Sequence, residues 1–249
     1  MGFKLRQPKI RKPKGSTMCY KAHNKPLYLT SVLNSMLKKT RTSFLASASL
    51  LVAVVFSSIN IASAANVANG EQLSQTCLGC HGAPGLRNPG PVYSIPMIGG
   101  QNEQYIISSL QAYKAKTRGH KTMQAQASNL SDADMADIAA YFSSMEGNSR
   151  PSLVSEAKAA MGKKASITCA ACHGQTGNGV AGQEQNPKLS GQYESFLVQA
   201  LKDYRSGDRK NAIMSGFAGN LTIGQIEALA AYFASQEGDL SAPKTKIFK

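Results

Sequence analysis

The sequence has no tryptophan and very few cysteines, and four of its five cysteines lie in two short motifs. Because only Cys19 lies elsewhere, no pair of thiols remains for a separate disulfide framework. No stretch shows the sustained alternation of apolar and polar residues that is typical of a β-strand. Apolar positions instead recur at helical spacing, so the sequence predicts an all-α protein.

Acidic residues are absent from residues 1–64, which contain eleven lysines or arginines. The remaining residues contain 17 lysines or arginines against 14 aspartates or glutamates, a net charge of only +3 out of the total of +14. The basic character therefore belongs to the first 64 residues, and a nucleic-acid-binding function loses its main support.

Residues 1–64 have the layout of a leader, and we expect the signal peptide at about residues 36–64. A basic segment at residues 38–41 precedes an apolar stretch from Phe44 to Ile61, and Ala62-Ser63-Ala64 is a small-residue cleavage site. The alternative is a retained membrane anchor, but the strongly apolar part is short for a span of ~20 residues. We expect export to the periplasm and cleavage near Ala64/Ala65.

The first 35 residues are unusual for a signal peptide, because they would lengthen its basic region well beyond the ordinary. A start at Met36 gives a leader of ordinary length. Residues 1–35 are therefore interpreted as an upstream extension that is not translated, and the alternative is a genuine basic tail.

Two pentapeptides of the pattern C-x-x-C-H lie 92 residues apart, and this pattern is typical of covalent haem c attachment. On a helix, residues three and four apart share a face, so two thiols can reach one porphyrin edge while the histidine faces the iron. The predicted attachment residues are Cys77 and Cys80 for the first haem and Cys169 and Cys172 for the second. The predicted proximal ligands are His81 and His173. A zinc site is disfavoured, because four thiols in an oxidising compartment tend to pair.

The two halves of the remaining chain align with an offset of 91 or 92 residues, which indicates an internal repeat. Thr76-Cys77 matches Thr168-Cys169, and Ala140-Tyr141-Phe142 matches Ala231-Tyr232-Phe233. We therefore expect two homologous domains and two connecting segments. Their predicted bounds are 66–146 for domain 1, 147–155 for the linker, 156–238 for domain 2 and 239–249 for a basic tail that is loose from Ser241.

Each half is predicted to contain three helices joined by long loops. The first pair of helices is expected at about residues 67–77 and 154–172, and the second pair at about 103–115 and 193–205. Gln101 and Gln192 are interpreted as residues that begin the second helix. The third pair begins at Ser131 and Thr222, where a capping-box pattern precedes apolar residues at helical spacing.

Methionines are the candidates for the sixth iron ligand, and the repeat selects among them. Met123 matches Met214, whereas the other methionines that follow the first haem motif match residues of other types. Both lie 41 or 42 residues beyond their histidine, in a segment expected to be a loop that folds over the haem. An unmatched methionine is better interpreted as core filler. His120 matches Asn211 and is interpreted as a surface residue.

With these motifs the chain resembles the dihaem cytochrome c4 family, which has two tandem cytochrome c domains, each a few helices wrapped around a covalent haem. The resemblance implies that a proline carbonyl accepts a hydrogen bond from each proximal imidazole, and Pro96 and Pro187 match that position. It also implies that a glycine of the first helix packs against an aromatic residue of the third. Gly70 and Gly162 match this glycine, opposite Tyr141 and Tyr232 or their phenylalanine neighbours.

Two further matched pairs are candidates for contact with the haem propionates. Arg118 and Arg209 suit carboxylates because of their planar guanidinium groups, and Tyr113 and Tyr204 could donate hydrogen bonds. The alternative interpretation is an exposed loop arginine and a core tyrosine in each half.

The family resemblance implies a periplasmic, non-enzymatic electron carrier of a respiratory chain. Its expected redox protein partners are a quinol-oxidising complex as donor and a terminal oxidase as acceptor, and the carrier is expected to be soluble or loosely associated with the membrane. One alternative is a cytochrome subunit of a larger oxidase or dehydrogenase. Another is a dihaem enzyme such as a peroxidase or a thiosulfate-oxidising cytochrome, which the paired methionines disfavour.

Overall fold

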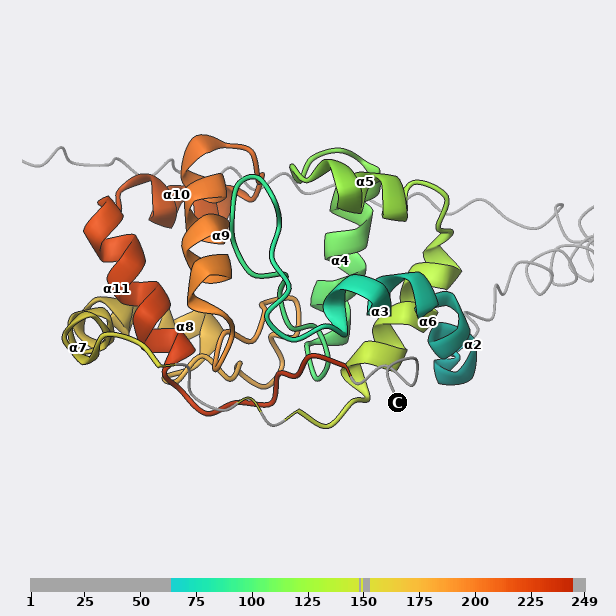
Figure 1. The fold of residues 1–249 in the computed structure, drawn as a ribbon, viewed down its shortest axis with the longest axis horizontal. Helices are drawn as coiled ribbons and strands as arrows, with labels where there is room; N and C mark the ends of the chain where they lie inside the picture. The colour runs from blue at the N-terminus through green and yellow to red at the C-terminus, as the bar shows by residue number, and fades with distance from the viewer. Residues whose placement is uncertain (1–63, 148, 150–152, 244–249) are drawn as a thin grey trace, which may run out of the picture. The chain divides into compact units, whose positions relative to one another are not determined.

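The structure, a computed structural model, describes residues 64–147, 149 and 153–243 (Figure 1). The expected leader falls outside this part of the chain except for Ala64, and so does the end of the tail. Within the described residues the regular structure is helical, and β pairing is limited to isolated bridges. No helix in these ranges has both the length and the apolar character needed to cross a membrane.

The described residues form two sets of helices in the same order, which confirms the all-α fold class (Figure 1). The first half contains α2 (Val67–Leu73), α3 (Gln75–His81), α4 (Glu103–Lys114), α5 (Lys121–Ala127) and α6 (Asp132–Ser143). The second half contains α7 (Glu156–Ala165), the 3₁₀ turn η1 (Ser166–Thr168), α8 (Ala170–His173), α9 (Glu194–Ser206), α10 (Ala212–Gly219) and α11 (Ile223–Ala234).

The first helix of each half is interrupted just before the haem motif, and the expectation of one continuous helix was wrong. Ser74 separates α2 from α3, and η1 starts at Ser166 between α7 and α8. Both serines are buried. Serine forms helix interiors less readily than alanine or leucine, because its hydroxyl competes for backbone hydrogen bonds.

The third helices begin at the capping boxes predicted from the sequence. The Ser131 hydroxyl accepts from Asp134 N–H, and the Asp134 carboxylate accepts from Ser131 N–H. Thr222 and Gln225 make the same reciprocal pair in α11. Gln101 and Gln192, in contrast, precede α4 and α9 rather than beginning them.

The first and third helices of each half cross at a glycine, as the family resemblance implied. A Cβ atom on Gly70 would lie 2.0 Å from the Asp137 carbonyl oxygen and 2.9 Å from Tyr141 Cβ. A Cβ atom on Gly162 would lie 1.9 Å from the Ala228 carbonyl oxygen and 2.7 Å from Tyr232 Cβ. Only glycine allows the two backbones to approach this closely.

Gly162→Ala should destabilise the second half by at least about 1–3 kcal/mol, the usual cost of overpacking, because backbone atoms of α11 would have to move. Thermal unfolding of the holoprotein measures this. Gly224→Ala lies in α11, where an added Cβ atom would have no neighbour within 4 Å; it is the control and should be neutral or slightly stabilising. Equal stability of Gly162→Ala and Gly224→Ala would contradict the close crossing.

The segment that follows the third helix of each half pairs with backbone of the other half. Ser149 pairs with Gly238 of the second half, and Ser241 pairs with Gly99 of the first. Leu240 is fully buried. The expectation that the tail is loose from Ser241 was therefore wrong at Ser241 itself, because a backbone bridge to Gly99 holds it.

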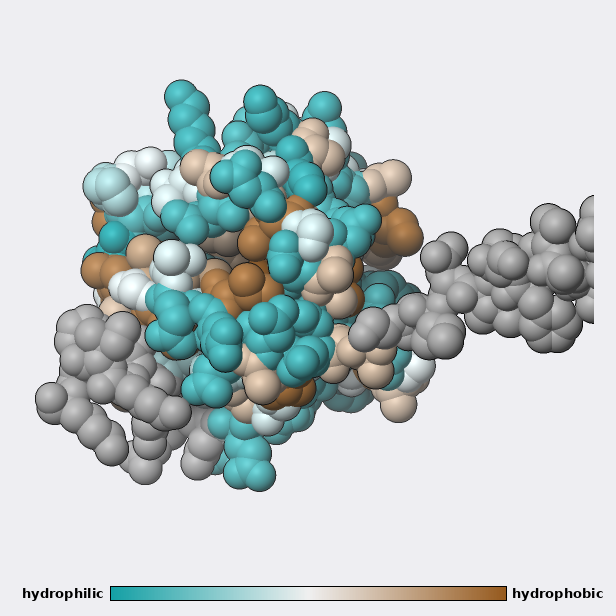
Figure 2. Space-filling model, turned by 90° about the vertical axis from the view of Figure 1, so that its right-hand side faces the viewer, coloured by the Kyte–Doolittle hydropathy of each residue, from teal (hydrophilic) through white to brown (hydrophobic). Residues whose placement is uncertain are grey.

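One face of the first half is mainly hydrophilic, with a smaller group of apolar side chains near its centre (Figure 2). Val67, Leu86 and Val92 are among the exposed large apolar residues of this half. Such a mixture is ordinary for a protein surface, since apolar atoms contribute much of the accessible area.

Candidate haem sites

Each C-x-x-C-H motif occupies a short helical segment with its thiols free. Cys77 and Cys80 lie in α3. Cys169 caps the N-terminus of α8, and Cys172 lies within that helix. In both motifs the first cysteine is partly buried, and burial raises the pKa of the Cys77 and Cys169 thiols. The thiols of each motif are therefore three residues apart along one helical segment, as two adjacent attachment points require.

The histidine that ends each motif is held by a proline carbonyl. His81 Nδ1 donates to Pro96 O over 2.8 Å, and His173 Nδ1 donates to Pro187 O over 2.9 Å. A carbonyl oxygen can only accept, so the Nδ1 atom carries the hydrogen and Nε2 keeps its lone pair. Burial lowers the pKa of both imidazoles, although the proline carbonyls oppose this. Neutral imidazole with a free Nε2 is the form that binds a metal.

The matched methionines lie in short helices rather than in the loop that we expected. Met123 lies in the first turn of α5 and Met214 in the first turn of α10. Met123 packs against the core of the first half, which Cys77 also contacts.

The residues that cap these two helices are His120 and Asn211, a mismatched pair in the alignment of the two halves. His120 Nδ1 accepts from Met123 N–H over 3.2 Å, and Asn211 Oδ1 accepts from Met214 N–H over 3.0 Å. His120 is partly buried between Tyr93 and Tyr113, so its interpretation as a surface residue was wrong. The matched pair instead shares one role, which is to fix the turn that carries the methionine.

Arg118 and Arg209 are buried rather than exposed in loops, and each lies over a tyrosine. The guanidinium carbon is 4.5 Å from the Tyr113 ring centre for Arg118 and 4.4 Å from the Tyr204 ring centre for Arg209. The two arginines form a backbone bridge with each other, so they meet where the two halves meet. Arg209 Nη2 also donates to the Tyr105 hydroxyl across the halves over 2.7 Å.

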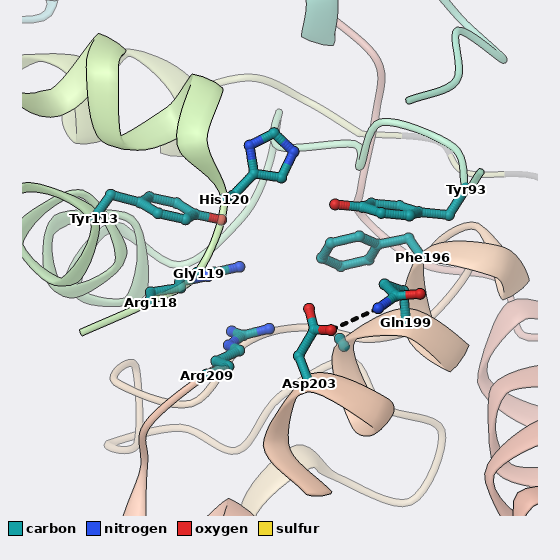
Figure 3. A pocket seen from close by; sticks show the side chains of 10 residues that line it. Tyr93, Tyr113, Arg118, Gly119, His120, Phe196, Gln199, Asp203 and Arg209 are labelled. Carbon is teal, nitrogen blue, oxygen red and sulfur yellow. Dashed lines mark hydrogen bonds between the residues drawn. The ribbon is translucent and has the colours of Figure 1, made fainter. Parts of the chain in front are cut away.

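A small pocket lies at this junction (Figure 3). Its lining comes from both halves: Tyr93, Tyr113, Arg118, Gly119, His120, Phe196, Gln199, Ala200, Asp203 and Arg209. In Figure 3 both guanidinium groups point toward the same space as the Asp203 carboxylate, which accepts from Gln199. The ion pairs within residues 64–147, 149 and 153–243 are Lys158–Glu227 and Lys188–Asp239, so neither arginine belongs to one.

The positive charge at this junction lowers the pKa of a neighbouring phenol, that of Tyr105. Burial by itself raises the pKa of Tyr105, but Arg118 and Arg209 outweigh it and lower that pKa to about 7. Alignment of the two halves missed Tyr105 and Asp203, because their matching positions in the other half are Phe196 and Ala112. Only the junction between the halves brings these residues together.

The residues present fit a covalently attached haem in each half. The thiols are free and the imidazole has an available Nε2. No group of three or more His, Cys, Asp or Glu side chains among the described residues is arranged to hold a metal ion. The candidate donors in each half are one imidazole and, by the match within the repeat, one thioether, a set that would suit iron already held by a macrocycle.

Comparison with known proteins agrees with this geometry. The family model for cytochrome c matches residues 67–146 and again residues 159–237. A cytochrome c4 of Pseudomonas aeruginosa is 35% identical over 180 residues, which cover 68% of this chain and 88% of that protein. A thiosulfate dehydrogenase electron acceptor of Thiomonas intermedia is 29% identical over 174 residues, which cover 65% of this chain and 78% of that protein.

A solved structure shows the same arrangement of helices. The crystal structure of reduced recombinant cytochrome c4 from Pseudomonas stutzeri is 32% identical to this chain, with a TM-score of 0.61. The match covers 70% of this chain and all of that one. The doubled family match, the relatives and the shared fold together place this chain in the cytochrome c family, as a cytochrome c4-like electron carrier with tandem domains that bind haem c covalently.

Proposed function

We propose that this protein holds two haems c, one in each half, and carries single electrons between redox proteins of the periplasm. The observation that supports this most strongly is the repetition, in one chain, of a C-x-x-C-H helix whose histidine donates to a proline carbonyl. Each haem, when bound, would let the protein take up and release one electron reversibly at iron.

The proposed ligand roles are supported by the hydrogen bonds of the two histidines and, for the methionines, by the match within the repeat. Cys77 and Cys80 attach the first haem and Cys169 and Cys172 the second. His81 and His173 bind iron through Nε2, because Nδ1 is already engaged. Met123 and Met214 would hold the same iron through their thioether sulfurs. Binding of iron by a thioether together with an imidazole would raise the reduction potential and would favour electron transfer over catalysis.

Arg118 and Arg209 are proposed to bind haem propionates at the junction between the halves. Both guanidinium groups are buried and lack a carboxylate ion-pair partner within the described ranges. A buried charge normally requires a partner of opposite sign, and a propionate provides one with suitable geometry. The rings of Tyr113 and Tyr204 face the two guanidinium groups and would orient them, and their hydroxyls stay candidate donors to the propionates.

The partners are proposed to be a quinol-oxidising complex as donor and a terminal oxidase as acceptor. Relatives named as thiosulfate dehydrogenase electron acceptors favour a second donor, a thiosulfate-oxidising enzyme. In either case this protein accepts and passes on electrons without transforming a substrate.

A redox titration of protein purified from the periplasmic fraction tests the proposal. We expect two haems per chain by mass, two reversible one-electron waves and low-spin ferric spectra with methionine ligation at both. Fast turnover of peroxide or thiosulfate by the protein alone, or a high-spin ferric haem, would instead favour an enzyme. Reduction by thiosulfate dehydrogenase but not by a quinol-oxidising complex would select the second donor.

A further inference from the structure

Two buried glutamines join the halves in a reciprocal way. Gln192 Oε1 accepts from Met97 N–H over 3.0 Å, and Gln192 Nε2 donates to Met97 O over 2.8 Å. In the other direction, Gln101 Oε1 accepts from Lys188 N–H over 2.8 Å, and Gln101 Nε2 donates to Lys188 O over 3.0 Å. Each side-chain amide therefore binds both backbone groups of one residue in the opposite half.

Local structure fixes the direction of these amides. Gly100 and Gly191 adopt positive φ angles of 73° and 68°, which turn the chain just before each glutamine. Each Oε1 also accepts from the next backbone N–H of its own half, at Asn102 or Tyr193. With 4% and 3% of their surface exposed, Gln101 and Gln192 make these contacts away from water.

The residues that these amides bind are those directly after the prolines of the haem sites. The peptide group between Pro96 and Met97 accepts from His81 through its oxygen and donates to Gln192 through its N–H. The peptide group between Pro187 and Lys188 connects His173 and Gln101 in the same way. Each glutamine is thus one peptide group away from the proximal imidazole of the opposite half.

Hydrogen bonds in such a chain strengthen one another. When the peptide N–H donates to a glutamine oxygen, the peptide oxygen becomes a better acceptor. A better acceptor makes the imidazole more electron-rich, which favours ferric iron and lowers the reduction potential. The bidentate contact with the glutamine also fixes the orientation of the peptide plane, and with it that of the imidazole.

We infer that Gln192 and Gln101 are positioning residues that tune the haem of the opposite half through the proline peptide that holds its histidine. The inference rests on the proposed function, because it requires His81 and His173 to be iron ligands. It predicts a crossed effect: a change in the second half alters the first haem, and a change in the first half alters the second.

The test is a redox titration of the holoproteins Gln192→Leu and Gln101→Leu. Replacement removes the acceptor for the peptide N–H, so Gln192→Leu should raise the potential of the first haem and leave that of the second unchanged. Gln101→Leu should do the reverse. The two waves are assigned with Met123→His and Met214→His proteins, and hydrogen exchange at the Met97 and Lys188 amides reports loss of each contact.

Tyr193→Phe is the matched control, because it removes a different hydrogen bond between the halves, from Gly85 N–H to the Tyr193 hydroxyl. It should leave both potentials unchanged. A shift of the haem in the altered half only, no shift despite faster exchange at Met97, or an equal shift in Tyr193→Phe would overturn the inference. If wild-type protein lacks two haem waves, the proposed function has failed instead.

Discussion

Replacing Cys77, Cys80, Cys169 and Cys172 together by serine should yield a chain with little native helix content and no cooperative thermal transition. The main cluster of buried apolar residues in the second half is Leu197, Leu229, Ala230, Tyr232, Phe233 and Ala234, and half of its members are alanine or tyrosine. Domains of ~80 residues have small cores, and a native state is stabilised by only about 5–15 kcal/mol. Loss of the apolar macrocycle should exceed this margin.

Circular dichroism during thermal unfolding measures this effect. A protein with serine at Cys77 and Cys80 only provides an internal control, since its second half keeps its own haem. We expect that protein to retain about half of the helical signal, together with one redox wave. A cooperative transition in the chain without any haem would show that the protein core suffices, and would contradict the prediction.

Met123→His and Met214→His should each lower the potential of one haem by an amount on the order of 0.2 V. Axial ligands set haem potentials over a span of ~0.8 V, and imidazole in place of a thioether stabilises ferric iron. Redox titration measures the shift, and the far-red absorption of methionine-ligated ferric haem should disappear at the altered site only.

Met135→Leu is the control for these two variants, because Met135 is a fully buried core methionine of α6. It should change stability by less than about 1.5 kcal/mol and leave both potentials in place. Unchanged coordination in either histidine variant would refute the assignment of that methionine as the sixth ligand.

Much of each haem site could be predicted from the sequence, because its elements are local. The pentapeptide places its cysteines and histidine within two turns of one helical segment, and the capping boxes at Ser131 and Thr222 set the start of the third helices. The repeat paired Met123 with Met214, whose role as iron ligands stays a prediction, and it did not predict the short helices that carry them.

Hydrogen bonds between segments in different halves could not be predicted in this way. Arg118 and Arg209 match as equivalents in the repeat, and nothing in the pattern shows that they meet. Gln101 and Gln192 were interpreted only as residues that begin a helix, because their partners lie 87 and 95 positions away in the sequence.

The sequence by itself determined the family, the haem-binding motifs, the helical class and the repeat, since spacings of three or four residues fix which side chains share a helix face. Only the tertiary structure decided what lies between the halves: the paired arginines, the pocket beside them and the glutamines bound to the proline peptides. The physical reason is that such contacts depend on how two folded units pack together, and helical periodicity within either unit carries no record of that packing.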